Sequence, residues 1–477
     1  MDRSIVFQQR DYDALQGHLF ADATREQGAL LLAATGTSPT ALRLIVREVL
    51  ALDDGDYLAH EIDRLVIAPH ALARAMKRAA RANLSLVLVH THPGAIDRVG
   101  FSEVDDEGEG RIFAVVGERL PRAPHASLVF GRNVAAGRIW ERACATPIDR
   151  VVVVGESLRY VTSDAVGVEP RGVVAGERYD RQVRAFGADG QRTLSSLRVG
   201  VVGCGGTGSA VVEQLVRLGV GYALVIDPDI VEESNLTRVY GSTKEDATGR
   251  RNKVDLAVRL AAGLGRGVAV VPLVGDVRDE DVARRLIGVD VIFGCTDSHW
   301  SRLVLNRLST QYLIPLIDLG TRIDARGGTL RGVVGRVSTI RPGDPCLFCA
   351  GVINGKVIAA ESLPDDERRK QMDEGYIQGV EEHAPSVISL NTVVAGAAVT
   401  ECLRMATGWR ADGNVRGHQS VYNALTGTMR AVSFDADPAC WCRDVVGCGD
   451  AMALPCRPSP RRGVESSGRD SAAVFLS

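Results

Sequence analysis

Two histidines separated by one residue are the first group in the sequence whose type and spacing could bind a metal ion. His90 and His92 close a run of aliphatic residues, and Asp105 follows in the next segment. Because side chains at positions i and i+2 of a strand project to the same side, both imidazoles can reach one ion. Asp105 would be the third protein ligand and would leave the fourth position to water, the arrangement of a catalytic zinc site.

Hydrolysis at such a centre also needs a carboxylate that takes a proton from the water and a donor that stabilises the oxyanion. Glu48 suits the first role and Ser102 the second. Glu61 and Asp106 are the alternatives to Glu48 and Asp105. A metal-free domain that only presents a partner also stays open. A deaminase site is disfavoured, because its P-C-x-x-C signature does not follow an H-x-E here.

The order of an upstream glutamate, H-x-H-P and S-x-x-D resembles the motif of the JAMM (MPN/JAB) metalloproteases. That family cleaves peptide or isopeptide bonds after ubiquitin-like carboxyl termini. The resemblance implies a cytidine-deaminase-like α/β fold with one catalytic Zn²⁺. Its ligands and reacting groups would be His90, His92 and Asp105, with Glu48 as general base and Ser102 as stabiliser of the tetrahedral intermediate.

A glycine-rich loop in the middle of the chain indicates a nucleotide site. Gly203, Gly205, Gly206 and Gly208 follow an apolar run and precede a helical pattern. Glycines let the backbone approach a phosphate, and the helix amino terminus supplies N–H donors. Asp227 ends the next apolar run, where it could accept a hydrogen bond from a ribose hydroxyl. The loop alone would suit NAD, FAD or ATP equally.

Polar residues that follow the loop favour nucleotidyl transfer over hydride transfer. Hydride transfer needs an apolar nicotinamide slot, whereas cations here could neutralise phosphates and a carboxylate could hold Mg²⁺. The candidates are Arg181, Asp229, Asn235, Arg238, Lys253 and Asp297. A solvated rim on an ordinary Rossmann domain is the alternative interpretation.

From RYDRQ through SNLTR to the paired cysteines, residues 178–442 resemble the ThiF/MoeB/ubiquitin-activating-enzyme adenylation family. That family adenylates the carboxyl terminus of a ubiquitin-like protein or peptide with ATP and Mg²⁺. By resemblance, the residues that line the nucleotide and hold its ribose are Gly203, Gly205, Gly206, Gly208 and Asp227. Phosphate contacts are implied for Asn235, Arg238 and Lys253, and an Mg²⁺ contact for Asp297. Arg181 would reach the ATP of a second subunit, which implies a homodimer.

The chain has ten cysteines and no segment typical of a secretory signal, which favours metal or thiol chemistry over disulfides. Cys346 and Cys349 form a Cys-x-x-Cys pair, and four thiolates make a closed structural zinc site. The resemblance implies a second pair, for which we select Cys440 and Cys442, with Cys448 as the substitute. Small buried core cysteines are the alternative.

The sequence has no cysteine between Cys349 and Cys402. A thiol that could take the activated carboxylate as a thioester is therefore absent from this segment. Either the adenylate is released or handed on, or another nucleophile takes it. Ser362, Ser386 and Ser389 are in range, but nothing in the sequence activates them.

Strand–helix alternation after the glycine loop predicts a doubly wound, Rossmann-like sheet with helices on both faces. Strands are expected over 198–202, 223–226, 268–274, 289–294 and 315–319, and helices over 210–219, 253–262, 279–286 and 300–312. In the first 160 residues we expect a helix over 41–49 and strands over 84–90 and 150–155.

The 477 residues suit roughly two to four domains. We predict a JAMM-like peptidase domain at 1–160, a linker at 161–177, an adenylation domain with its zinc site at 178–456 and a disordered tail at 457–477. The net charge is −3, which gives no general attraction to nucleic acid or membranes. No apolar run approaches the ~20 residues of a membrane helix. We therefore expect a cytoplasmic protein.

Together these features predict a bifunctional α/β enzyme. The peptidase would trim or remove a ubiquitin-like modifier, and the second domain would adenylate the exposed glycine carboxylate. Such fusions resemble bacterial ubiquitin-like conjugation systems, which adds a ubiquitin-conjugating-like enzyme as a partner, and fusion could raise the effective concentration of the trimmed tail. Sulfur-carrier activation for cysteine, thiamine or molybdopterin metabolism, and a non-catalytic scaffold that binds a modifier, are the alternatives.

Overall fold

The computed structural model describes residues 1–457 except 23, 63, 142–143, 163–176, 266–267, 327–328, 365, 369, 371–373, 375–384 and 410–416. Most of the predicted linker at 161–177 and nearly all of the predicted tail at 457–477 lie outside the described residues. Two sheets organise the rest of the chain, one on either side of the segment 163–176.

The first unit is built on a nine-stranded mixed sheet with the order β11-β10-β1-β3-β2-β6-β7-β8-β9. Helix α1 (Gln9–Leu19) packs on one face, while α2 (Pro69–Ala82) and α3 (Glu103–Arg119) pack on the other. Strand residues alternate between these faces, as the strand period of two requires: Leu31 contacts the α1 core, and Leu30 and Leu32 contact the α2–α3 core.

The strands of this unit are β1 (Asp2–Gln8), β2 (Gly28–Thr37), β3 (Ala41–Ala51), β6 (Ser85–Thr91), β7 (His125–Phe130), β8 (Ala135–Glu141), β9 (Cys144–Pro147), β10 (Arg150–Val154) and β11 (Leu158–Tyr160). A separate hairpin is formed by β4 (Tyr57–His60) and β5 (Leu65–Ile67). The strands predicted over 84–90 and 150–155 are therefore confirmed as β6 and β10.

The helix predicted over 41–49 is wrong. These residues form β3, which pairs with β1 and β2 in the middle of the sheet. Leucine, arginine and glutamate favour a helix locally, but the segment is covered on both faces. A strand buried on both faces has a nearly continuous apolar run, and here that tertiary packing overrides local propensity.

The second unit has an eight-stranded sheet with the order β14-β13-β12-β15-β16-β17-β18-β19. Strands β12 to β16 pair in parallel and the last three pair antiparallel. Their bounds are β12 (Arg198–Val202), β13 (Tyr222–Ile226), β14 (Ala269–Leu273), β15 (Val291–Gly294), β16 (Leu316–Arg326), β17 (Thr329–Ile340), β18 (Gln419–Asn423) and β19 (Thr428–Val432).

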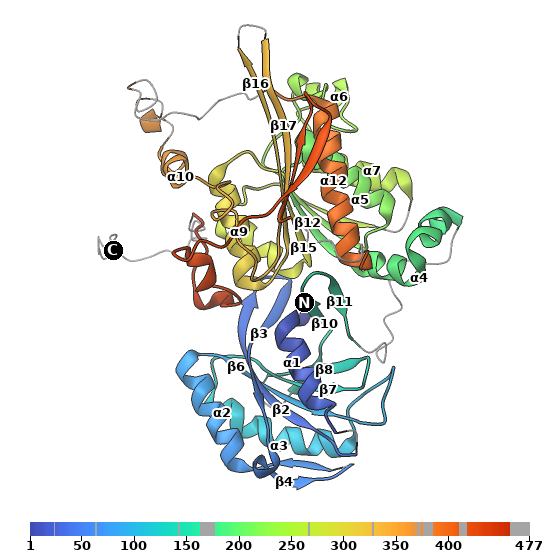
Figure 1. Ribbon diagram of the computed structural model, residues 1–477, viewed down its shortest axis with the longest axis vertical. Helices are drawn as coiled ribbons and strands as arrows, with labels where there is room; N and C mark the ends of the chain where they lie inside the picture. Colours follow the sequence, from blue (N-terminus) through green and yellow to red (C-terminus); the bar gives the residue numbers. More distant parts are fainter. Residues whose placement is uncertain are drawn as a thin grey trace.

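Helices cover both faces of this sheet, as the sequence predicted. On one side lie α4 (Asp180–Ser196), α5 (Gly206–Leu218), α7 (Lys253–Leu264) and α12 (Ile388–Thr407) (Figure 1). On the other lie α8 (Glu280–Arg284), α9 (His299–Tyr312) and α10 (Gly355–Glu361). The small α6 (Lys244–Thr248) follows β13. Each strand and helix predicted after the glycine loop has its counterpart here, with shifted ends.

The two units share one hydrophobic core. Val6, Ile45 and Val152 of the first sheet pack in the same cluster as Leu286 and Tyr312 of the second unit. None of the helices in the described part of the chain is both long and apolar enough to cross a membrane.

Candidate functional sites

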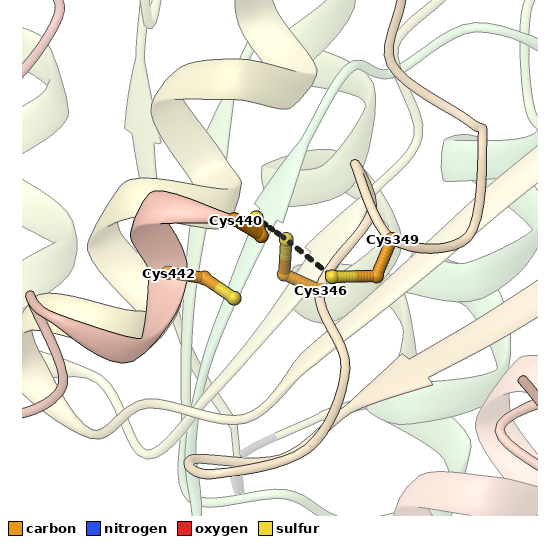
Figure 2. A group of neighbouring side chains, drawn as sticks. All are labelled: Cys346, Cys349, Cys440 and Cys442. Atoms are coloured by element: carbon orange, nitrogen blue, oxygen red, sulfur yellow. Dashed lines mark hydrogen bonds between the residues drawn. The ribbon is translucent and has the colours of Figure 1, made fainter. Parts of the chain in front are cut away.

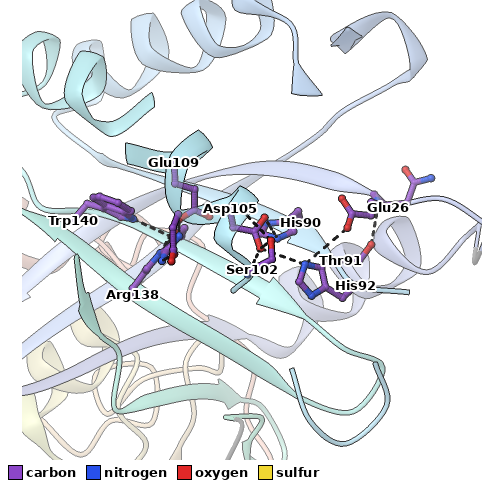
Figure 3. Close-up of polar contacts among 12 residues, drawn as sticks. Glu26, His90, Thr91, His92, Ser102, Asp105, Glu109, Arg138 and Trp140 are labelled. Carbon is purple, nitrogen blue, oxygen red and sulfur yellow. Dashed lines mark hydrogen bonds and ion pairs between the residues drawn. The ribbon is translucent and has the colours of Figure 1, made fainter. Parts of the chain in front are cut away.

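The two histidines and the aspartate of the first motif come together at one end of the nine-stranded sheet. His90 lies in β6, His92 follows that strand, and Asp105 lies in the first turn of α3. His90 Nε2 is 3.1 Å from Asp105 Oδ1, and His92 Nε2 is 3.4 Å from Asp105 Oδ2 (Figure 3). One donor atom of each residue lies within 4.8 Å of the others, a set that could hold one metal ion.

Ser102 is the residue that starts α3 and thereby fixes Asp105. Its hydroxyl donates to Asp105 Oδ2 at 2.8 Å, and its backbone N–H donates to the same oxygen at 2.7 Å. Burial raises the pKa of Asp105, but hydrogen bonds from His90 and His92 outweigh it and hold that pKa well below its usual range. The hydrogen bond that His92 donates to the Asp105 carboxylate raises the pKa of His92.

Glu26, and not Glu48, stands beside these histidines. Glu26 Oε1 lies 3.9 Å from His92 Nε2. Glu48 forms an ion pair with Arg78 of α2, because strand β3 turns its side chain toward that helix. The choice of Glu48 as the carboxylate next to the metal ligands is therefore corrected to Glu26, and Glu61 touches this region through its main-chain carbonyl, which accepts from Glu26 N at 2.9 Å.

A buried network next to the triad anchors α3 to β8. Arg138 pairs with Glu109 at 2.7 Å and with Asp106, so Asp106 is engaged away from the histidines. Ser127 Oγ donates to Glu109 Oε2 at 2.5 Å. Burial raises the pKa of Glu109 above its ordinary value. These contacts hold the helix that carries Asp105 and Ser102.

The glycine loop turns tightly between β12 and α5. Gly203 has a φ of 91°, a left-handed conformation that favours glycine. A Cβ on Gly208 would lie 1.8 Å from the carbonyl oxygen of Gly203, whereas one on Gly205 would meet no atom within 4 Å. The open side of Gly205 and the amino terminus of α5 form a cradle of the kind that binds phosphate.

Asp227 and Lys253 both lie close to this loop. The Asp227 carboxylate accepts from Cys204 N at 2.5 Å and from Asp229 N at 2.8 Å, so it also holds the loop in shape. Burial raises the pKa of Asp227. Lys253 Nζ lies 2.7 Å from Asp229 Oδ2. Cys204 and Lys253 both line a pocket with a volume of about 210 Å³.

The other residues predicted to contact ATP or Mg²⁺ are Asn235, Arg238 and Asp297, and each has different surroundings. Asn235 is buried and its side-chain oxygen accepts from Glu232 N at 3.2 Å. Arg238 donates to Ser234 O at 2.7 Å, and its Cδ lies 3.5 Å from the Cβ position of Gly206, so it borders the loop. Asp297 is exposed in the segment after β15.

Arg181 is not brought to the glycine loop of its own chain. It is exposed at the start of α4, and its neighbour Gln182 donates to Arg217 O at 3.3 Å, at the carboxyl end of α5. The glycine loop is at the opposite end of α5, and a helix of this length spans about 20 Å.

Asn391 is a site neighbour that sequence reasoning missed. It is 1% exposed on α12, and its Nδ2 lies 2.2 Å from the Cβ position of Gly206. An asparagine among the mainly apolar residues of α12 was the available signal, because a buried amide needs polar partners.

The four selected cysteines form one cluster. Cys346 Sγ lies 3.8 Å from Cys349 Sγ and 3.6 Å from Cys440 Sγ, and Cys442 completes the group (Figure 2). Zinc–sulfur bonds of about 2.3 Å place tetrahedral sulfurs about 3.8 Å apart, so these spacings fit a zinc ion. Cys448 lies elsewhere, with its Sγ 3.8 Å from Gly449 O.

The cysteines of this cluster differ in their pKa values: burial raises those of Cys440 and Cys442, whereas a backbone donor favours the thiolate of Cys349. Burial raises the pKa of Cys349, but hydrogen bonds from Asp437 N at 3.4 Å, from Cys346 and from Cys440 together outweigh it, and the pKa is lowered. Hydrogen bonds of this kind to sulfur are common where cysteines bind a metal ion.

Comparisons with known proteins concern the second unit. The model of the ThiF family matches residues 179–442. The sulfur carrier protein ThiS adenylyltransferase of Bacillus subtilis (strain 168) is 29% identical over 273 residues, covering 56% of this chain and 72% of that protein. The molybdopterin-synthase adenylyltransferase of Escherichia coli (strain K12) is 28% identical over 265 residues, covering 55% of this chain and 94% of that protein. The SAMP-activating enzyme E1 of Haloferax volcanii is 32% identical over 175 residues, covering 36% of this chain and 61% of that protein. The family match does not include the histidine triad.

Proposed function

The chain belongs to the ThiF family, and from this premise we propose that its second unit adenylates the terminal carboxylate of a ubiquitin-like or sulfur-carrier protein with ATP. The observation that carries the proposal is the glycine loop at the start of α5, bordered by Arg238 and Lys253. The named activities of the relatives in Bacillus subtilis and Escherichia coli support it.

The reaction requires a carboxylate oxygen to attack the α-phosphorus of ATP while pyrophosphate leaves. Negative charge then grows on the phosphates, where N–H groups of the loop and the two cations can stabilise it. Lys253 would exchange its contact with Asp229 for a phosphate. Asp297 would hold Mg²⁺, which supplies further charge neutralisation when bound.

Arg181 is proposed to act on the nucleotide of a second copy of the chain. Its exposure and its place at the far end of α5 support this arrangement, since it cannot reach its own loop. The proposal therefore includes a homodimer. Mixing Arg181→Ala and Lys253→Ala chains should restore one working site per mixed dimer, and no recovery after verified subunit exchange would contradict the trans arrangement.

For the first unit we propose a JAMM-type zinc peptidase that trims or removes the ubiquitin-like protein. The convergence of His90, His92 and Asp105 carries this proposal. Zn²⁺ held by these residues would supply an activated water when bound. Glu26 takes the place of the predicted base Glu48 because its carboxylate lies 3.9 Å from His92 Nε2, whereas Glu48 pairs with Arg78. Ser102 would stabilise the oxyanion.

The cysteine cluster is proposed as a structural zinc site of the adenylation unit. Its four thiolates come from two distant segments, Cys346–Cys349 and Cys440–Cys442. An ion there would cross-link the segment after β17 to the segment after β19, since a structural zinc contributes directly to folding.

ATP–pyrophosphate exchange tests the adenylation proposal. The purified chain is assayed with ubiquitin-like proteins that end in glycine, ThiS among them. Arg238→Ala and Lys253→Ala should each lower exchange at least about 100-fold, the usual scale for one preorganised electrostatic contact. Lys77→Ala, on the exposed face of α2, is the matched control and should exchange normally. If both variants exchanged pyrophosphate at the rate of the parent chain, these assignments would be wrong.

A matched pair of glutamates tests the peptidase proposal. Gln is nearly isosteric with Glu but cannot take a proton from water, so Glu26→Gln should keep the metal and lose cleavage of a ubiquitin-like protein with a carboxyl-terminal extension. Glu48→Gln should cleave normally. The reverse result would restore Glu48 as the base. A parent protein that cleaves nothing would leave the metal-free presenter as the better reading of this unit.

A further inference from the structure

The histidine triad lies at the end of the first sheet that points away from the second unit. Gly28, at the start of β2, pairs with His90. Thr37, at the other end of β2, donates to Asp450 at 2.9 and 2.7 Å and accepts from Arg284 at 2.8 Å. A strand of this length spans about 30 Å, so the triad is about that far from the second unit.

The glycine loop lies at the end of the second sheet that points away from the first unit. Arg198 N, at the start of β12, donates to Asp290 Oδ2 at 2.9 Å. Asp290 also accepts from Arg150 at 2.6 and 2.7 Å and from Tyr160 at 2.8 Å, and both of these belong to the first unit. The glycine loop begins after Val202, about 16 Å further along β12. The two candidate centres thus lie on opposite sides of the unit interface, on the order of 40 Å or more apart.

The contact between the units is too well packed to act as a hinge. Asp290 is 1% exposed and Arg43 is 1% exposed. Arg43 donates to the carbonyls of Ile287 at 3.4 Å, Val289 at 3.1 Å and Leu313 at 3.2 Å, all in the second unit. A buried, hydrogen-bonded contact of this kind moves as one body with both sheets.

We propose that the two centres serve separate molecules of the ubiquitin-like protein, so that a trimmed molecule leaves into solution and rebinds before it is adenylated. This inference rests on the proposed function. A tail of about six residues reaches at most about 20 Å, less than the separation, and the body of an 80-residue carrier has a radius of gyration of about 12 Å. Within one chain, the fusion therefore gives no gain in effective concentration, since linkage helps only where the geometry allows both engagements.

The two steps also balance as separate reactions. Hydrolysis consumes one water and yields a carboxylate and a free amine on the released extension. Adenylation joins a carboxylate oxygen to the α-phosphorus and breaks its bond to pyrophosphate. The trimmed protein with its carboxylate is a stable product of the first step, so nothing in the chemistry requires direct transfer to the second centre.

Isotope dilution tests this inference with the full chain. The probe is a ubiquitin-like protein found active in the exchange assay, made with a heavy isotope label and a short carboxyl-terminal extension. It is mixed with ATP, the chain and an excess of the unlabelled mature protein, and adenylate and mature protein are analysed by mass spectrometry after short times. The expected result is a labelled share of the adenylate equal to the labelled share of mature protein in solution.

An adenylate enriched in label above the solution pool would overturn the inference, because it would mean direct transfer. Absence of trimmed product would instead contradict the peptidase, and overturn this inference with it. As a second measurement, an equimolar mixture of Glu26→Gln and Lys253→Ala chains should convert the extended probe as fast as the parent chain at the same concentration of each working centre. A slower mixture would likewise indicate transfer within one chain.

Discussion

Replacing Arg43 by methionine should destabilise the whole molecule and not only the first unit. Arg43 is buried at the contact between the units and donates to three main-chain carbonyls of the second unit. Burial lowers the pKa of its guanidinium to about 10, which leaves it charged at neutral pH. Methionine fills the space of the aliphatic stem but offers no donor.

The size of the effect follows from the groups left behind. Each buried carbonyl that loses its donor costs about 1–3 kcal/mol, while the loss of a buried charge recovers part of the desolvation cost. We therefore expect the free energy of unfolding to fall by about 3–5 kcal/mol. Urea denaturation, followed by fluorescence and circular dichroism, measures it, and one cooperative transition is expected because the units share a core.

Arg47→Met is the matched control. Arg47 lies on the same strand and reaches the same unit, but it is exposed and donates to a single carbonyl, Val446 O, at 2.7 Å. Its loss should cost about 1 kcal/mol or less. If both variants unfold at the same urea concentration, the buried guanidinium is not what joins the units, and two separate transitions would refute the shared core.

Three further predictions concern the loop, the cysteines and pH. Gly208→Ala should abolish the folded loop because its Cβ would lie 1.8 Å from a backbone oxygen, while Gly205→Ala should keep the melting temperature yet lower pyrophosphate exchange. Cys346→Ser should remove one zinc per chain by elemental analysis, while Cys448→Ser should keep it. Burial lowers the pKa of His125, so the unfolded state binds its proton first; stability should be full above about pH 6.5 and fall as the pH drops below it, and His125→Asn should show a smaller slope between neutral and acidic pH.

The triad could be predicted from sequence because local spacing determines most of its geometry. His90 and His92 share one side of a strand end, and Ser102 begins the helix that carries Asp105. Glu26 could not be found in this way. It reaches His92 only because β2 pairs antiparallel with β6, which brings the residues just before β2 beside the end of β6.

The contact between the units could not be predicted for a related reason. The residues from Ala41 to Val49 were expected to form a helix, and they form strand β3. In the structure Arg43 is buried against main-chain carbonyls, which leave no trace in a sequence. The strands after the glycine loop were easier to predict from the sequence, because parallel buried strands are short continuous apolar runs that end in glycine or charged residues.

The place of the contact suggests why the two units are joined. The first unit contacts the residues at the beginnings of β12 and β15. Asp290 accepts from Arg198 N at the start of β12, and the carbonyls of Ile287 and Val289, just before β15, accept from Arg43 of the first unit. The far ends of these strands carry the glycine loop and the segment of Asp297. A sheet whose strand beginnings are fixed positions its strand ends precisely enough for catalysis, since sites on rigid elements are held better than sites on free loops. This geometry therefore favours physical support of the proposed nucleotide site, rather than nearness of the two proposed centres, as the advantage of joining the units.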